Sequence, residues 1–364
     1  MDETAFRRIV AGERKDLTAT VVRTAAAVAA LPYGLAVSVR NWCYDHGVLP
    51  SWTAGVPVVS VGNLTTGGTG KTPMVALVVK QLQRLGLKPG ILSRGYRATT
   101  HRSRSPSPNT TPTTPSNDEW LVLERLCPAV PHVQHPDRVK GAAEAVQAGC
   151  NVLVLDDGFQ HRRLRRDLDI VLVDATNPWG FGHLLPRGLL REPRSSLQRA
   201  HLLVVTRIEL CEPEQVDALC KELKQLAAPE TPLVRVAFQP TCLINSLGKQ
   251  EHVSCLRDRS VLAFCGIGNP ESFERTVRST GAKLQSLVTF PDHYVFSDED
   301  LRQLGEEATR LDAEMLITTL KDLVKIKHAD VRNLPLWALH VEPVVQEGKQ
   351  HLERLLAQLA QAAK

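Results

Sequence analysis

A glycine-rich segment, SVGNLTTGGTGKTP at residues 60–73, carries the strongest chemical signal in the sequence. Glycines allow backbone N–H groups to point at phosphate oxygens, and a Lys-Thr pair adds an ammonium for β and γ phosphates and a hydroxyl for Mg²⁺. The segment departs by one residue from the strict G-x-x-x-x-G-K-[ST] spacing, because Thr65 stands in place of the first glycine, and it matches the GGxGK[ST] variant better. A glycine-rich turn with a chance Lys-Thr pair is the alternative interpretation. The predicted phosphate contacts are Thr65, Thr66, Gly67, Gly68, Thr69, Gly70, Lys71 and Thr72.

Two acidic residues, Asp156 and Asp157, directly follow four apolar residues in NVLVLDDGFQH. A phosphate loop needs a carboxylate on a neighbouring strand to hold the metal's water shell, and paired acids can divide the work between Mg²⁺ and a proton or a neighbouring group. Two acids that merely begin a surface loop are the alternative. The basic residues that follow are typical either of a solvated face or of a site for an anionic substrate group. They are His161, Arg162, Arg163, Arg165 and Arg166.

These side chains need a rigid frame, and the pattern from residue 56 onwards predicts one. Short β-branched runs alternate with helical stretches, which is typical of an α/β fold with a parallel sheet covered on both faces. A helix at about residues 72–85 follows the glycine-rich loop, and buried strands are predicted at 152–155, 170–173 and 202–206.

The predicted domain boundaries follow changes in composition along the chain. Residues 49–235 form the phosphate-loop domain, 236–345 form a smaller α/β domain, and 346–364 form a closing helix. Between residues 98 and 117, sixteen of the twenty residues are Ser, Thr, Pro or Asn. Such a segment cannot bury a core, so we expect a flexible insert there.

Residues 1–48 contain a stretch of sixteen residues without a formal charge, 24–39, bracketed by Arg23 and Arg40. A membrane-crossing helix needs about 20 apolar residues, so this stretch is predicted to be too short to span. We expect a helix lying in the bilayer surface with its basic neighbours facing anionic headgroups. An Ala-rich helix packed on the protein's own core is the alternative.

Composition excludes several classes of protein. The chain has 364 residues, 43% of them hydrophobic and 23% charged, and a formal net charge of +5. Wholesale disorder and a polytopic membrane protein are excluded by these values. The eight cysteines are scattered without a C-x-x-C pair, which argues against a zinc knuckle or a disulfide framework and favours a reducing cytoplasm. Basic residues do not interleave with aromatic ones, so nucleic-acid binding is disfavoured.

Six motifs in one order resemble the tetraacyldisaccharide 4′-kinase family: GNLTTGGTGKTP, LDDGFQHRRL, LLPRGLLREP, FCGIGNPESF, FPDHYVF and TTLKDLVKI. The resemblance implies ATP-dependent transfer of a phosphoryl group to the 4′-hydroxyl of tetraacyldisaccharide 1-phosphate, giving lipid IVA in lipid A biosynthesis. It implies two α/β/α domains, the larger with a phosphate-loop NTPase-like parallel sheet, and an N-terminal membrane-associated helix. ATP and Mg²⁺ are the implied cofactors. The implied location is the cytoplasmic face of the inner membrane, peripheral or monotopic, with no obligate protein partner.

The resemblance also implies roles for particular residues. Nucleotide and metal contacts fall on Lys71, Thr72, Asp157 and Glu192, with Asp156 beside them, and Arg191 is implied as a phosphate contact. Lys71 is in addition an implied catalytic residue.

The family's catalytic carboxylate corresponds to Asp118 in NDEW, where Asn117 and Trp120 depart from the family's GDEP motif, and its partner corresponds to His293 in the PDH motif. A carboxylate can take the proton of the acceptor hydroxyl while an imidazole orients it. With Asp118 in the first domain and His293 in the second, domain closure over the substrates is expected.

Two other functions remain open on the sequence. One is a soluble phosphate-loop kinase or ligase that acts on a small metabolite. The other is a nucleotide-switched, membrane-associated ATPase without acceptor chemistry, since GGTGKT loops also occur in such proteins. If activity on a lipid needs the N-terminal helix, the soluble kinase or ligase is disfavoured. If a phospholipid product forms, the switch ATPase is disfavoured.

Overall fold

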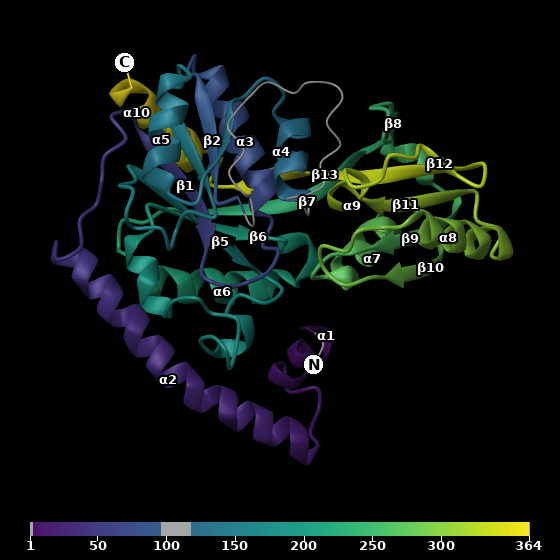
Figure 1. The fold of residues 1–364 in the computed structure, drawn as a ribbon, viewed down its shortest axis with the longest axis horizontal. Coiled ribbons are helices and arrows are strands. Elements are labelled where there is room, and N and C mark those ends of the chain that lie inside the picture. Colours follow the sequence, from purple (N-terminus) through teal and green to yellow (C-terminus); the bar gives the residue numbers. More distant parts are fainter. Residues whose placement is uncertain (1–2, 96–117, 364) are drawn as a thin grey trace. The chain divides into compact units, whose positions relative to one another are not determined.

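The computed structural model of the chain describes residues 3–95 and 118–363 (Figure 1). The insert predicted at residues 98–117 therefore lies outside the described residues. The described residues divide into two compact units. The first contains residues 3–95, 127–237 and 345–363, and the second contains 118–126 and 238–344.

The first unit is built on a parallel sheet whose described strands lie in the order β7-β6-β5-β1-β4-β2-β3. The centre is β1, which pairs with β4 on one side and β5 on the other. Because the order of the strands reverses at β1, its carboxyl end lies where open α/β sheets bind their ligands. The strands are β1 (Val58–Asn63), β2 (Pro89–Ser93), β3 (His132–Gln134), β4 (Val152–Asp156), β5 (Leu168–Asp174), β6 (Leu202–Thr206) and the first part of β7 (Leu233–Ile244).

Helices surround this sheet in Figure 1. Every residue of β1, β4, β5 and β6 is buried, which requires cover on both faces of the sheet. The helices are α3 (Lys71–Arg84), α5 (Arg138–Gln147), α6 (Pro213–Leu226) and α10 (Lys349–Ala362). Helix α10 packs against α3, so the closing helix at the carboxyl end belongs to the first unit. The α/β fold class predicted from the sequence is confirmed.

Two helices precede the sheet, α1 (Glu3–Val10) and α2 (Leu17–Asp45). Asp16 caps α2 by accepting a hydrogen bond from the backbone N–H of Ala19 at 2.9 Å. The helix extends well beyond the predicted stretch 24–39, and by length and composition alone it could cross a membrane, so the prediction that it is too short is wrong. Most of its apolar side chains are exposed, which also contradicts packing into the core. These exposed residues are Leu17, Val21, Val28, Leu31, Leu35, Val39 and Trp42.

The second unit contains parallel strands in the order β10-β9-β11-β13. Short strands β12 and β8 add antiparallel pairs to β13 and to the end of β7. The strands are β8 (Gln250–His252), β9 (Ser260–Cys265), β10 (Lys283–Thr289), β11 (Met315–Thr319), β12 (Asp330–Val331) and β13 (Leu334–Glu347). The helices are α4 (Asp118–Leu126), α7 (Pro270–Ser279), α8 (Asp298–Arg310) and α9 (Leu320–Leu323).

Helix α4 belongs to the second unit, although the sequence placed residues 49–235 in a single domain. Val122 is part of a hydrophobic cluster of the second unit that also contains the edge-to-face pair of Phe264 and Phe296, with ring centroids 5.2 Å apart. The prediction that Asp118 lies in the first domain is therefore wrong, because the apolar face of α4 packs against α9. Domain closure was expected because Asp118 and His293 were assigned to different domains. That reason no longer holds, because both residues lie in the second unit.

Candidate active site

The glycine-rich loop joins β1 to α3 at the centre of the first sheet, as predicted. Strand β1 ends at Asn63 and α3 begins at Lys71, so the loop occupies the amino end of a helix, where backbone N–H groups are free to bind an anion. Gly70 caps the helix with φ of +82°, a left-handed conformation that favours glycine. The Thr206 hydroxyl donates to the backbone oxygen of Thr69 at 3.1 Å and ties the loop to β6.

Lys71 and Arg191 converge on the carboxylate of Asp157. The ammonium of Lys71 lies 3.7 Å from Asp157 Oδ1 and donates to Asn63 Oδ1 at 3.3 Å. Arg191 Nη1 lies 2.7 Å from Asp157 Oδ2. Burial alone would raise the pKa of Asp157, but the positive charges of Lys71 and Arg191 outweigh it and hold the pKa below the ordinary value. Asp157 is therefore ionised, and its φ of +54° is a strained conformation of the kind that proteins retain at functional sites.

The segment containing Arg191 runs alongside the start of the phosphate loop. The backbone N–H of Arg191 donates to the oxygen of Leu64 at 2.7 Å, and that of Thr66 donates to the oxygen of Leu189 at 2.7 Å. Thr65 and Leu190 form an antiparallel bridge between these two hydrogen bonds. The backbone thus fixes the guanidinium of Arg191 beside the loop.

The residues present fit a magnesium ion that is held mainly by phosphates and water. Thr72 occupies the second position of α3, and Asp157 supplies an ionised carboxylate beside Lys71. Among the described residues no group of three or more His, Cys, Asp and Glu side chains is arranged to hold a metal. Asp156 is buried at the last position of β4.

Glu192 has partners that differ from those expected of a metal ligand. Its side chain is fully buried, with Oε1 2.7 Å from Arg40 Nη2 and Oε2 2.5 Å from Arg199 Nη2. Both carboxylate oxygens are engaged by guanidinium groups. The proposed protein ligands of Mg²⁺ are therefore Thr72 and Asp157, with Asp156 beside them.

Three of the basic residues after Asp157 form ion pairs with carboxylates of the chain. Arg162 binds Asp45, Arg163 binds Asp137 and Arg166 binds Asp169. Burial lowers the pKa of His161 to about 4, so its ring is neutral near pH 7. These contacts favour neither of the two interpretations of the run, since the arginines bind carboxylates of the chain itself.

In the second unit, His293 and Asp118 form a hydrogen-bonded pair. His293 Nδ1 lies 3.0 Å from each oxygen of Asp118, which is 1% exposed, whereas the side chain of His293 is 57% exposed. The two residues were predicted to be partners, and the structure brings them together within one unit.

Two lysines that were not among the predicted site residues complete this cluster. Lys321 Nζ and Lys325 Nζ lie 3.7 Å and 3.9 Å from Asp118 Oδ2. Their four-residue spacing in TTLKDLVKI was the available signal, since residues four apart share a helix face. Lys321 also lies 2.8 Å from Asp292 Oδ1, and Lys325 2.7 Å from Asp322 Oδ1.

The lysines and the histidine set the charge of Asp118. Burial would raise its pKa, but the hydrogen bond from His293 and the charges of Lys321 and Lys325 hold the pKa below the ordinary value. The hydrogen bond to Asp118 in turn raises the pKa of His293. An ionised carboxylate thus stands behind an exposed imidazole, an arrangement in which the imidazole can accept a proton from a substrate and the carboxylate stabilises the resulting charge.

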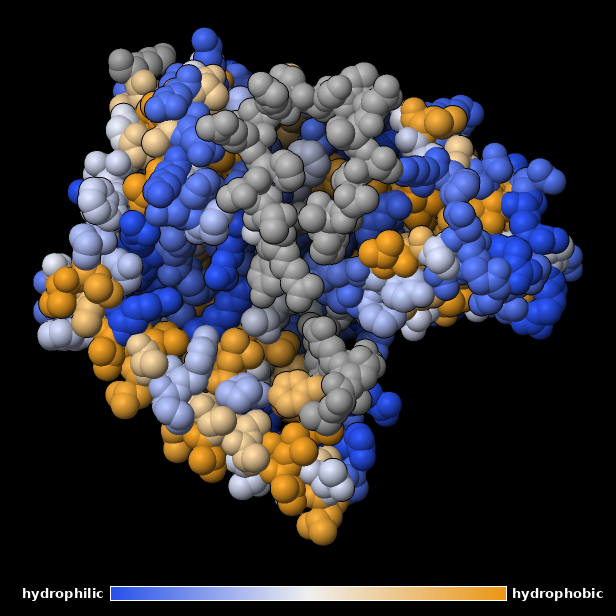
Figure 2. All heavy atoms as spheres, in the orientation of Figure 1, coloured by the Kyte–Doolittle hydropathy of each residue, from blue (hydrophilic) through white to orange (hydrophobic). Residues whose placement is uncertain are grey.

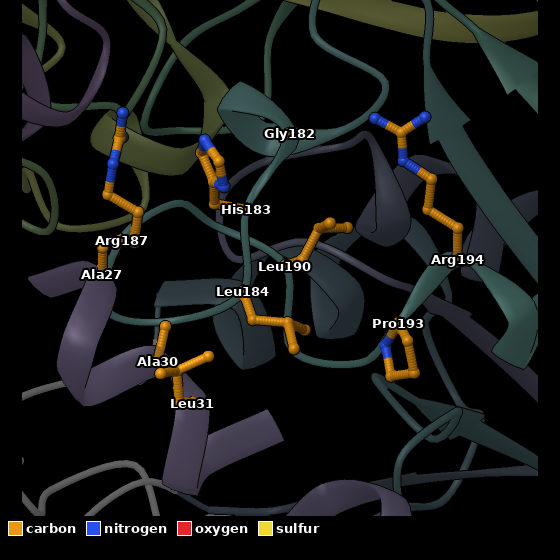
Figure 3. Close-up of a pocket in the computed structure, with 10 residues that line it drawn as sticks. All are labelled: Ala27, Ala30, Leu31, Gly182, His183, Leu184, Arg187, Leu190, Pro193 and Arg194. Atoms are coloured by element: carbon orange, nitrogen blue, oxygen red, sulfur yellow. The ribbon is translucent and has the colours of Figure 1, made fainter. Parts of the chain in front are cut away.

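A separate pocket of about 440 Å³ lies between α2 and residues 182–194 (Figure 3). Ala27, Ala30 and Leu31 of α2 and Leu184 and Leu190 supply an apolar lining. Charged and polar groups of His183, Arg187 and Arg194 also line it. The pocket therefore offers both apolar carbon and positive charge.

Replacement of Gly62 tests how tightly β1 holds the turn after Asp157. A Cβ atom at Gly62 would lie 2.8 Å from the backbone nitrogen and 2.7 Å from the Cβ of Phe159, so the Asp157–Phe159 turn must move. We expect Gly62→Ala to weaken ATP binding about tenfold or more and to lower the melting temperature, because overpacking costs about 1–3 kcal/mol. Titration with ATP measures the first effect. Gly68→Ala, where a Cβ meets open space, is the steric control for the melting temperature.

The central strand, the glycine-rich loop and α3 together define a phosphate-loop α/β protein. The family model described as Tetraacyldisaccharide-1-P 4′-kinase matches residues 22–361. The chain belongs to this family.

Similar proteins extend over most of the chain. Tetraacyldisaccharide 4′-kinase of Anaeromyxobacter sp. (strain K) is 40% identical over 307 residues, which cover 83% of this chain and 81% of the relative. The enzyme of that name from Chlorobaculum tepidum is 35% identical over 350 residues, which cover 93% and 97%. A crystal structure of LpxK from Aquifex aeolicus in complex with ATP is 30% identical, with a TM-score of 0.71, and the match covers 93% of this chain and 99% of the other.

Proposed function

We propose that the chain transfers the γ-phosphoryl group of ATP to the 4′-hydroxyl of tetraacyldisaccharide 1-phosphate, forming lipid IVA in lipid A biosynthesis. The observation that carries this proposal is the family match, which spans nearly the whole chain and includes the phosphate loop. The relatives' names and the ATP complex of the similar crystal structure support the same substrates.

The first unit is proposed to bind ATP. Backbone N–H groups of the loop hold the phosphates, except those of Thr66 and Thr69, which donate to the oxygens of Leu189 and Gly67. The ammonium of Lys71 neutralises charge on the β and γ phosphates. The guanidinium of Arg191, which pairs with Oδ2 of Asp157, contacts the phosphates as well. Mg²⁺, held by Thr72 and Asp157, would supply charge neutralisation to the phosphates when bound.

The second unit is proposed to supply the proton acceptor. Asp118 was predicted to accept the proton while His293 orients it, but the burial of Asp118 favours the opposite assignment. The exposed imidazole of His293 accepts the proton of the 4′-hydroxyl, and Asp118 holds the ring through Nδ1 and stabilises the imidazolium. Lys321 and Lys325 keep Asp118 ionised so that it can do so.

The decisive experiment incubates the purified protein with γ-labelled ATP, Mg²⁺ and tetraacyldisaccharide 1-phosphate. We expect label in the lipid product. Label released as free phosphate with none in the lipid would favour a switch ATPase. Transfer to a small water-soluble acceptor but not to the lipid would favour a soluble kinase.

We further propose that α2 lies along the surface of the membrane on the cytoplasmic side. Its exposed apolar row fits the hydrocarbon boundary, whereas polar contacts from Tyr33 and Arg40 to the first unit hold the helix along the protein. A helix held in this way is expected to lie on the bilayer rather than cross it.

Vesicle binding tests this location. The full chain should sediment with vesicles that contain anionic lipid, and the double substitution Val28→Asp and Leu35→Asp should reduce the bound fraction by about tenfold or more, because each charge opposes burial of that face. Val295→Asp, which changes an equally exposed apolar residue of the second unit, serves as the control. Unchanged binding of the α2 variant would refute the proposed location.

A further inference from the structure

Helix α2 is joined to the residues that flank the phosphate loop, and we propose that Arg40 and Tyr33 are positioning residues for the nucleotide site. Through them, the seating of α2 on the first unit and the binding of ATP are coupled. This inference rests on the proposed function, since it takes the phosphate loop as the ATP site.

The first link is a buried bridge from α2 to Glu192. Arg40 Nη2 lies 2.7 Å from Glu192 Oε1, and Arg199 occupies the second oxygen at 2.5 Å. Glu192 is fully buried, whereas Arg40 is 39% exposed. Removal of Arg40 leaves a buried carboxylate with one partner instead of two, and this is a costly arrangement that the backbone around Glu192 relieves by moving.

The second link is a hydrogen bond to the neighbouring residue. The hydroxyl of Tyr33 donates to the backbone oxygen of Arg191 at 2.9 Å. Tyr33 and Arg40 are seven residues apart, about two helical turns, so both side chains leave the same face of α2. One face of α2 therefore holds Arg191 and Glu192, two consecutive residues of the segment 189–192.

The segment transmits this position to the nucleotide site by three contacts. Arg191 Nη1 donates to Asp157 Oδ2 at 2.7 Å, and its backbone N–H donates to Leu64 at 2.7 Å. The oxygen of Leu189 accepts from Thr66 of the loop itself. A displacement of residues 189–192 would thus move the guanidinium proposed to contact the phosphates and the start of the loop together.

The opposite face of α2 is apolar, and this suggests what the link could respond to. Figure 2 shows hydrophobic residues gathered along α2, so the helix has an apolar face whose occupation by lipid would fix its place. A helix that is seated holds Arg191 in position, and a helix that is displaced releases it. ATP binding then depends on whether the helix is in place.

The test measures ATP affinity of the full chain in detergent micelles without the lipid acceptor. Arg40→Met should raise the dissociation constant for ATP about tenfold, which is within the usual range for coupled sites. Arg40→Lys, which restores the charge, should recover part of the affinity. Tyr33→Phe removes one hydroxyl, and so should fold normally and weaken ATP binding in the same direction by a smaller factor.

Arg162→Met is the matched control. Arg162 also ties α2 to the first unit, with Nη1 3.0 Å from the oxygen of Asn41 and Nη2 2.6 Å from Asp45 Oδ1. These bonds join α2 to the turn after Asp157 rather than to residues 189–192. We expect its ATP affinity to match that of the wild type.

The outcomes separate this inference from the proposed function. ATP affinity that is unchanged in both Arg40→Met and Tyr33→Phe overturns the inference and leaves the kinase proposal intact. An equal loss in Arg162→Met also overturns it, since any loosening of α2 would then suffice. A wild-type protein that binds no ATP overturns both.

Discussion

Lys71→Ala should lower kcat for lipid phosphorylation by about 10²- to 10³-fold, the usual cost of removing one preorganised group from a developing charge. The ammonium of Lys71 lies at the amino end of α3 beside Asp157, where it is proposed to neutralise the transferring phosphoryl group. Steady-state assays with labelled ATP and the lipid acceptor measure the effect.

The fold should survive this substitution, because Asp157 keeps its ion pair with Arg191. Lys80→Ala, which removes a lysine from the same helix, is the control and should retain activity. Near-normal turnover of Lys71→Ala would show that the loop does not act on the phosphates.

Asp118→Asn should lower kcat by about 10²- to 10⁴-fold, the range typical of general acid–base catalysis. The amide has nearly the shape of the carboxylate, but it cannot stabilise a protonated His293. Asp298→Asn is the control, since Asp298 is exposed and pairs with His328.

The pH profile distinguishes a catalytic role of the Asp118–His293 pair from a structural role. His293 accepts a proton only when it is neutral, and the hydrogen bond to Asp118 raises its pKa. Activity of the wild type should therefore fall as the pH drops through a pKa above the ordinary value of 6.5 for histidine. In Asp118→Asn the midpoint should move to lower pH. A midpoint that does not move would remove His293 from the role of proton acceptor.

Much of the first unit could be predicted because its signals are local. The loop, the strand before it and the helix after it lie within about 30 consecutive residues, and four apolar residues before Asp156 indicate a buried strand directly. The centre of the sheet and the neighbouring acids follow from these runs.

The assignment of α4 failed because it depends on contacts between distant parts of the chain. Nothing in the sequence around Asp118 indicates that Val122 packs with Phe264 and Phe296, which follow more than 130 residues later. Composition change is a weak guide to a unit built from two separate stretches of the chain. The prediction of the Asp118–His293 pair depended on motif resemblance, which carries information about contacts that local pattern lacks.

The arginine partners of Glu192 could not be predicted from the sequence, for a related reason. Its motif neighbours place it beside the nucleotide site, but its partners Arg40 and Arg199 come from a helix 152 residues earlier and a segment seven residues later. An acidic residue next to a phosphate loop suggests a metal ligand, and the sequence gives no sign of the two arginines that pair with this one.

The position of α10 bears on how the chain is made. This helix packs against α3, yet it is synthesised after all of the second unit. During translation the second unit can fold while the first is still incomplete. The surface of the first unit that Leu352, Leu356 and Leu359 of α10 cover stays exposed until then. The first unit is therefore completed only after the second unit has been synthesised.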